Sequence, residues 1–436
     1  MQKYLIAALA AALAAGCSGP DEAATPEDSV NTSEAGETEE LQDAAFDEPD
    51  APRDGPLVEI AAGDDFQTRL QTALIEAEVG STIQLPAGTF AITDGLSLDV
   101  DGVMLTGAGQ DETILDFTGQ RGSGEGLLVT SDDVILQNFT IQETKGDGIK
   151  SKGADRIIYR DLKVQWLGEP DENHGAYGVY PVESTDILVE RVWVRGASDA
   201  GIYVGQSNNI IVRNNLAEYN VAGIEIENST NAEVYANDVT KNTGGILVFD
   251  LPDLPVMGGH STRIYDNGIY GNNTRNFAPP GNIVAGVPSG TGVIIMANDR
   301  VEVSDNRFDD NQTVQVLVTA YTEPFTDPDY NPLPRNVVIT GNTFDEGGEN
   351  PQGILGDLAP LLGGQMPDIV WDGVTRWGDE PDTDVNLVID EIEGTSFVNL
   401  GLGSYPLNPA NAAPSRDMPG NTRDWQLEPV KLSHAE

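Results

Sequence analysis

A repeat of 22 residues constrains the fold of this chain more than any other feature. Gly201, Gly223 and Gly245 are each 22 positions apart, and each begins the pattern Gly-Ile-x-(Val/Ile). A period of this length, with short apolar alternation between Asn, Gly and Asp turns, indicates short strands rather than helices. We therefore predict that each repeat forms one rung of a solenoid.

The strand assignment also predicts which side chains face the core. Ile202 and Val204 should point inward and Tyr203 outward, because successive side chains of a strand alternate. Asparagines repeat with the same 22-residue spacing, as in the pairs Asn209/Asn231, Asn215/Asn237 and Asn220/Asn242. Stacked Asn amides can hydrogen-bond along the solenoid axis and satisfy turn backbone, so we assign these columns a structural role rather than a catalytic one.

Both ends of a solenoid need a cap, because the terminal strands expose unpaired edges. Residues 64–77 have the apolar periodicity of an amphipathic helix, and Asp64 and Gln67 are spaced like a capping box. We predict that this helix covers the N-terminal end. Gly353–Leu362 is predicted to form a short helix that closes the far end.

Two stretches carry a resemblance to known proteins. The helix followed by GSTIQLPAGTF, from Gly80 to Phe90, resembles the start of pectate-lyase-like β-helices, and the repeats between residues 173 and 252 resemble bacterial parallel β-helix repeat-containing proteins. The resemblance implies an all-β fold, a single-stranded right-handed parallel β-helix of the pectin-lyase type with an N-terminal capping helix. It also implies a carbohydrate-binding or sugar-hydrolysis relation, and supplies no catalytic residues.

The repeats define the domain organisation. We predict a β-helix over residues 57–400, with loop insertions near residues 251–290 and 321–334, and a surface tail over residues 401–436. The 47 residues that separate Gly245 from Gly292 are interpreted as two rungs that carry loops.

The N-terminal residues predict export. Residues 1–16 read as a lipoprotein signal peptide, and Cys17, the one Cys of the chain, stands where lipidation would occur, which also excludes an intramolecular disulfide. Residues 17–56 are acidic and poor in apolar side chains, so we expect a disordered tether. The predicted location is the envelope of a Gram-negative bacterium, and Ser18 favours the outer membrane over the inner one.

The charge balance limits the partners. The chain has 71 acidic and 23 basic residues, a formal net charge of −48, which argues against nucleic acid as a ligand. We expect a polysaccharide or another exported protein as partner, besides the membrane reached through the N-terminal lipid. No cofactor is required by the pattern, although Ca²⁺ is compatible with it.

The outward positions of the predicted strands supply the candidate site. They bring together two lysines, two tyrosines and two glutamates: Lys150, Lys152, Tyr180, Tyr203, Glu225 and Glu227. With Lys145 and Lys163, the lysines would form a basic strip beside aromatic side chains. Such a surface would suit a glycan, with tyrosines as platforms and charged groups for hydroxyl or uronate groups.

Three functions remain open at this point. The first is non-catalytic binding of a glycan or an exported partner along the strand face. The second is a polysaccharide lyase or related glycan-active enzyme, with Lys150 or Lys152 as the base for β-elimination of a polyuronate and Asp199, Glu225 and Glu227 as Ca²⁺ ligands. The third is a structural envelope protein.

Overall fold

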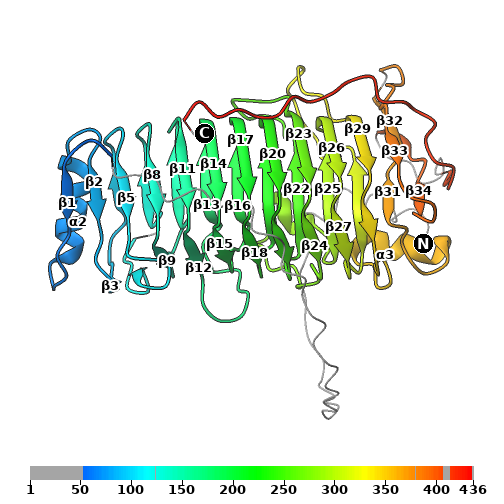
Figure 1. The fold of residues 1–436 in the computed structure, drawn as a ribbon. Helices are drawn as coiled ribbons and strands as arrows, with labels where there is room; N and C mark the ends of the chain where they lie inside the picture. Colours follow the sequence, from blue (N-terminus) through cyan, green and yellow to red (C-terminus); the bar gives the residue numbers. More distant parts are fainter. Residues whose placement is uncertain (1–52, 123, 379, 406–412, 435–436) are drawn as a thin grey trace, which may run out of the picture.

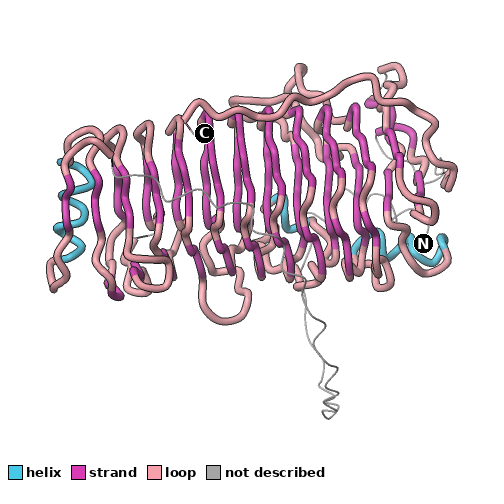
Figure 2. The backbone as a smooth tube through the Cα atoms, viewed as in Figure 1, coloured by secondary structure: helices cyan, strands magenta, loops and turns pink. Residues whose placement is uncertain are grey.

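The computed structural model describes residues 53–434, apart from residues 123, 379 and 406–412. Within these ranges the chain is a right-handed parallel β-helix built from three long parallel sheets, as the sequence predicted. Figure 1 shows the rungs stacked along one axis, and Figure 2 shows that helices contribute only short segments. No helix of the described residues is long and apolar enough to cross a membrane. The predicted signal peptide, Cys17 and most of the tether lie outside these residues.

We call the three sheets A, B and C. Each complete rung gives one strand first to sheet C, then to sheet A and then to sheet B. Sheet C contains, in chain order, β4 (Leu96–Leu98), β7 (Leu127–Val129), β10 (Ile149–Lys152), β13 (Tyr177–Val182), β16 (Ala200–Gly205), β19 (Ala222–Glu227), β22 (Gly244–Phe249), β25 (Thr291–Met296), β28 (Val314–Thr319), β31 (Ile369–Trp371) and β34 (Phe397–Asn399). This sheet positions the candidate site.

The other two sheets complete the solenoid. Sheet A contains β1 (Leu57–Glu59), β2 (Thr82–Gln84), β5 (Met104–Thr106), β8 (Ile135–Gln137), β11 (Ile157–Arg160), β14 (Thr185–Glu190), β17 (Asn208–Arg213), β20 (Thr230–Tyr235), β23 (His260–Tyr265), β26 (Asp299–Ser304), β29 (Arg335–Thr340) and β33 (Val388–Asp390). Sheet B contains β3 (Gly88–Ala91), β6 (Thr113–Asp116), β9 (Thr140–Gln142), β12 (Lys163–Gln165), β15 (Trp193–Arg195), β18 (Leu216–Glu218), β21 (Asp238–Thr240), β24 (Gly268–Tyr270), β27 (Arg307–Asp309) and β30 (Thr343–Phe344). A separate pair joins β32 (Val374–Trp377) and β35 (Gly403–Tyr405).

The repeat produces the predicted register. Ile202 pairs with Ile224, and Ile224 pairs with Ile246, so that like side chains stack in successive rungs. All three are fully buried in the main hydrophobic core, together with Val204, whereas Tyr203 belongs to a different cluster on the outer face of sheet C. The predicted inward and outward directions are therefore confirmed.

The asparagine columns form hydrogen-bonded ladders, as predicted. The side-chain amide of Asn215 donates to Asn237 Oδ1 at 2.9 Å, and Asn237 donates to Asn267 Oδ1 at 2.9 Å. The ladder continues through Asn306 to Asn342. A second ladder contains Asn220, Asn242, Asn272 and Asn311. Buried amides that bond to the next rung satisfy turn backbone that would otherwise be unpaired.

The helices differ in detail from the sequence-based expectation. The N-terminal helix α2 (Phe66–Glu76) packs an apolar face on the first rungs, but it begins at Phe66, and the predicted capping box is wrong. Asp65 occupies the N-cap, but its side chain pairs with Arg69 and makes no capping hydrogen bond, and Gln67 Oε1 accepts from the Thr93 amide at 2.9 Å. The helix α3 (Gly353–Leu362) has the predicted bounds but does not close the solenoid, because further strands follow it in sheets A and C.

Both long insertions between β22 and β25 belong to a single rung. β22 pairs directly with β25, so the 47 residues from Gly245 to Gly292 make a single rung, and the two-rung interpretation is wrong. One insertion, residues 250–259, connects β22 to β23. The other, residues 271–290, contains the 3₁₀ helix η1 (Ile283–Gly286) and connects β24 to β25.

The C-terminal tail returns along sheet A. Figure 1 shows this red segment running back over several rungs to end above β14. Val430 and Leu432 pack on an apolar column that includes Ile158 and Leu188. Nearer its start, the tail is held to β26, because Arg423 Nη2 lies 2.6 Å from Glu302 Oε2.

Candidate functional site

The outer face of sheet C carries a group of tyrosine and carboxyl side chains that we call the tyrosine–carboxyl cluster. It comes from β13, β16 and β19 and from the turns that precede β10 and β16. Its members are Asp147, Tyr177, Tyr180, Asp199, Tyr203, Glu225 and Glu227. Because parallel strands stack in register, residues from successive rungs meet on this face.

Three tyrosines form the aromatic part of the cluster. The ring centroids of Tyr177 and Tyr180 are 4.5 Å apart, those of Tyr177 and Tyr203 are 4.7 Å apart, and those of Tyr180 and Tyr203 are 4.8 Å apart. Tyr177 and Tyr180 are partly exposed, whereas Tyr203 is buried. Lys150 Nζ lies 4.5 Å from the Tyr180 ring centroid, within the range of a cation–π contact.

The position of Tyr203 depends on a glycine. Its ring lies over Gly205, where an added Cβ would come within 2.4 Å of the phenol. The missing side chain lets the Tyr203 hydroxyl reach the next rung, where it donates to Glu227 Oε1 at 2.7 Å. Gly205 and Glu227 are themselves paired across β16 and β19. The glycine at outward position 205 was therefore a sequence feature that indicated space for the Tyr203 ring.

Three carboxyl groups of the cluster are buried. Burial raises the pKa of Glu225 well above its usual value, and the neighbouring Glu227 and Asp199 raise it further. Neither carboxyl oxygen of Glu225 has a hydrogen-bond partner among the described residues, and the residue is 1% exposed. Burial also raises the pKa values of Asp199 and Glu227. Carboxyls with such values can retain a proton near neutral pH, as a general acid must.

Asp147 and Lys150 lie at the accessible edge of the cluster. Burial raises the pKa of Asp147 to about 6, opposed by the Lys150 ammonium. Lys150 Nζ is shared between Asp147 Oδ2 at 3.7 Å and Glu125 Oε1 at 3.6 Å. One cation thus faces two carboxylates at this edge.

The 271–290 insertion covers the buried part of the cluster. It folds back toward the N-terminal rungs, and Asn282 Nδ2 donates to Asp199 Oδ2 at 3.0 Å. Tyr177 donates to the same oxygen at 3.3 Å. Apolar side chains of the insertion pack with outward residues of β16, β19, β22 and β25. Leu247, Phe249 and Ile294 are buried beneath it, and Met296 packs against the same cluster.

The predicted basic strip does not form. Lys163 is in sheet B, on another face of the solenoid, where it pairs with Asp111 and lies over the Trp193 ring. Lys152 is exposed and pairs with Glu183 at 3.4 Å. Sequence spacing alone places the four lysines close together, but the solenoid distributes neighbouring strands over different sheets.

The described residues contain no group of three or more His, Cys, Asp or Glu arranged to hold a metal ion. Asp199, Glu225 and Glu227, the Ca²⁺ ligands of the lyase alternative, interact electrostatically but do not make up such a group. The buried groups are instead arranged around the tyrosines.

Sequence reasoning missed three members or contacts of the site. Tyr177 lies three positions before Tyr180, and Asp147 and Asn282 lie in turns or loops. Strict strand alternation would point Tyr177 inward with Val179, so the pattern that identified Tyr180 could not identify Tyr177, which packs with the outer cluster. Asn282 could not be identified either, because its contact with Asp199 spans 83 positions.

Comparison with protein families agrees with the fold. The family model for the right handed beta helix region matches residues 101–253. A comparison with curated proteins finds no significant match. Solved structures of similar fold include the mannuronan C-5 epimerase AlgE4 A-module of Azotobacter vinelandii, at 18% identity and a TM-score of 0.46, covering 78% of this chain and 92% of that chain. An alginate lyase from Paenibacillus sp. has 16% identity and a TM-score of 0.40, covering 67% and 96%. DFA-IIIase from Arthrobacter chlorophenolicus has 12% identity and a TM-score of 0.48, covering 77% and 94%.

Proposed function

We propose that this chain binds a carbohydrate at the tyrosine–carboxyl cluster. The observation that carries the proposal is the contact of three tyrosine rings, at centroid distances of 4.5–4.8 Å, beside carboxyl groups on one face of sheet C. A sugar presents apolar C–H faces and hydroxyl groups, which match aromatic rings and convergent polar groups. Tyr180 and Tyr177 supply the accessible part of such a surface.

The charge of the site favours a neutral glycan over a polyuronate. Lys150 is already shared by Asp147 and Glu125, and Lys152 pairs with Glu183. A uronate carboxylate would have to displace these acidic partners while approaching further carboxyls. The same pairing weakens the β-elimination hypothesis, in which Lys150 or Lys152 would act as a free base.

Titration with neutral oligosaccharides tests this proposal. We expect a panel of gluco-, xylo- and manno-oligosaccharides to include one that binds, measured by calorimetry, while oligogalacturonate does not. Tyr180→Ala should weaken binding by at least about tenfold, since 1.4 kcal/mol corresponds to that factor. Tyr270→Ala, which removes an exposed tyrosine from sheet B, is the matched control. Equal affinity of the wild-type and Tyr180→Ala proteins would contradict the proposal.

A glycan-active enzyme is the second candidate. It is supported by the raised pKa of Asp147, about 6, and of Glu225, which has no hydrogen-bond partner among the described residues. Cleavage of a glycosidic bond uses one protonated and one ionised carboxyl, and environments that separate their pKa values supply this pair. Release of reducing ends from the bound glycan, lost in Asp147→Asn, would support the enzyme, whereas binding without turnover would leave only the binding function.

The anchoring expectation is part of the same proposal. A lipid on Cys17 followed by the acidic segment would hold the solenoid at a membrane of the cell envelope. Mass spectrometry of the N-terminal peptide from the native host tests this, with Cys17→Ser as control. An unmodified Cys17 would contradict lipid anchoring without affecting the glycan proposal.

A further inference from the structure

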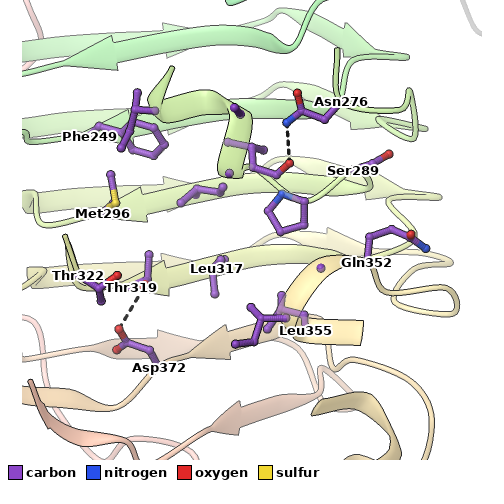
Figure 3. Close-up of a pocket in the computed structure, with 18 of the residues that line it drawn as sticks. Phe249, Asn276, Ser289, Met296, Leu317, Thr319, Thr322, Gln352, Leu355 and Asp372 are labelled. Atoms are coloured by element: carbon purple, nitrogen blue, oxygen red, sulfur yellow. Dashed lines mark hydrogen bonds between the residues drawn. The ribbon is translucent and has the colours of Figure 1, made fainter. Parts of the chain in front are cut away.

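A separate apolar pocket of about 400 Å³ lies farther along sheet C. Its floor comes from β25 and β28, and its walls come from the 271–290 insertion and α3. Figure 3 shows Met296, Leu317 and Leu355 pointing into the space between these elements. A pocket of this size is typical of sites that hold small organic ligands.

The lining is mostly aliphatic. The side chains that define its interior are Ile283, Val287, Ile294, Met296, Leu317 and Leu355. Phe249 supplies the one aromatic ring of the described lining. Flexible aliphatic walls without a stack of rings suit an aliphatic chain better than a flat aromatic ligand or a sugar.

The polar groups at the pocket are mostly engaged within the protein. Asp372 accepts from the Ala320 amide at 2.7 Å, the Thr319 hydroxyl at 3.0 Å and the Val374 amide at 2.9 Å. Asn276 donates to the carbonyl oxygens of Val284 and Val287, both at 2.9 Å, which shapes the wall. These contacts build the pocket and leave its interior apolar.

Arg275 differs from the other polar residues of the lining. It is exposed, and it has neither an ion pair nor a side-chain hydrogen bond among the described residues. This is notable in a chain with 71 acidic and 23 basic residues, where a cation usually finds a carboxylate. An unpaired guanidinium beside an apolar pocket is complementary to an amphiphile with an anionic head group.

We propose that this pocket binds a fatty-acid-class ligand, with its aliphatic chain between the insertion and α3 and its carboxylate on Arg275. At the solvent-exposed rim, salt screens the acidic groups that lie beyond about 8 Å, so the overall negative charge does not forbid the contact. The pocket and the tyrosine–carboxyl cluster share the 271–290 insertion, but the ligand proposal does not require glycan binding.

Calorimetric titration of the full chain with decanoate tests the proposal. We expect saturable binding to one site, and about tenfold weaker binding of decan-1-ol, which keeps the chain but lacks the charge. Arg275→Ala should weaken decanoate to a similar degree and leave decan-1-ol unchanged. Arg121→Ala, which alters an exposed arginine near the N-terminal end, is the matched control.

Two pocket-filling variants locate the binding. Leu317→Trp replaces a floor residue, and Ile354→Trp adds bulk from the partly exposed first turn of α3, where it is less disruptive to folding. Each should reduce decanoate affinity by more than about tenfold. The absence of saturable decanoate binding to the wild type, or unchanged binding by folded Ile354→Trp, would overturn the site. Equal affinities for decanoate and decan-1-ol would overturn the role of Arg275.

Discussion

Asn282 donates a hydrogen bond of 3.0 Å to the carboxyl group of Asp199, which lies 83 positions earlier in the chain. This contact joins the 271–290 insertion to the turn that precedes β16. On the inner side of the insertion, Phe277 and Val284 pack against the outer face of sheet C. The insertion is therefore a cover over the buried half of the tyrosine–carboxyl cluster. Its ends are hydrogen-bonded to neighbouring turns, and its middle is held over the cluster by the Asn282 contact and an apolar patch.

Removal of the polar contact should loosen this cover. In Asn282→Ala, Asp199 loses a donor, and the middle of the insertion keeps only its apolar packing on the cluster, at a cost of about 0.5–1.5 kcal/mol. We expect faster hydrogen exchange in β16 (Ala200–Gly205) and unchanged exchange in sheet B. Asn350→Ala, in another exposed loop, is the control. Unchanged exchange in β16 would mean that the apolar packing suffices.

Glu225 predicts a specific pH dependence of stability. Because its pKa is raised in the folded state from 4.5, folded protein holds this proton where unfolded protein has lost it. The free energy of unfolding therefore falls, through this group, as pH rises above about 4.5, by about 1.4 kcal/mol for each unit of the shift. The uncharged Glu225→Gln protein should avoid this loss.

Urea unfolding at pH 5 and pH 8 measures the effect. The stability advantage of Glu225→Gln over the wild type should be larger at pH 8 than at pH 5 by more than about 1 kcal/mol. Glu172→Gln, on an exposed loop, should show no such difference. An advantage that is equal at both pH values would indicate that Glu225 finds a partner, such as water, when it ionises.

The sequence could predict the solenoid because its evidence is local and periodic. The spacing of Ile202, Ile224 and Ile246 equals one rung, so a pattern along the chain becomes a stack in space. The candidate site, in contrast, depends on contacts that do not repeat along the chain. Tertiary packing, which the repeat spacing does not encode, decides the direction in which the 271–290 insertion folds. It also decides that Lys150 is shared by Glu125 and Asp147.

The asparagine ladder provides a test of the repeat itself. Asn237 is 1% exposed; it accepts from the backbone amide and the side chain of Asn215 and donates to Asn267 Oδ1 and the Val212 carbonyl. Asn237→Ala leaves several of these buried groups unpaired, and we expect a loss of about 2–4 kcal/mol in the free energy of unfolding. Urea unfolding measures it, with Asn173→Ala on an exposed loop as control. A loss below about 0.5 kcal/mol would mean that water replaces the amide.

The C-terminal tail should detach without unfolding the solenoid. Leu432 is 8% exposed and packs on the outward column of sheet A that includes Ile158 and Leu188, while the main core lies on the other side of that sheet. Leu432→Ala removes about 1–2 kcal/mol of apolar burial, nearly all of it from the tail contact. Local opening governs proteolysis when reclosing is fast, so tryptic cleavage after Lys431 should accelerate about tenfold while the thermal midpoint of the solenoid stays nearly constant. Met418→Ala, at a side chain that is 43% exposed, should leave the cleavage rate unchanged. A large fall in the thermal midpoint of Leu432→Ala would instead make the tail an integral part of the fold.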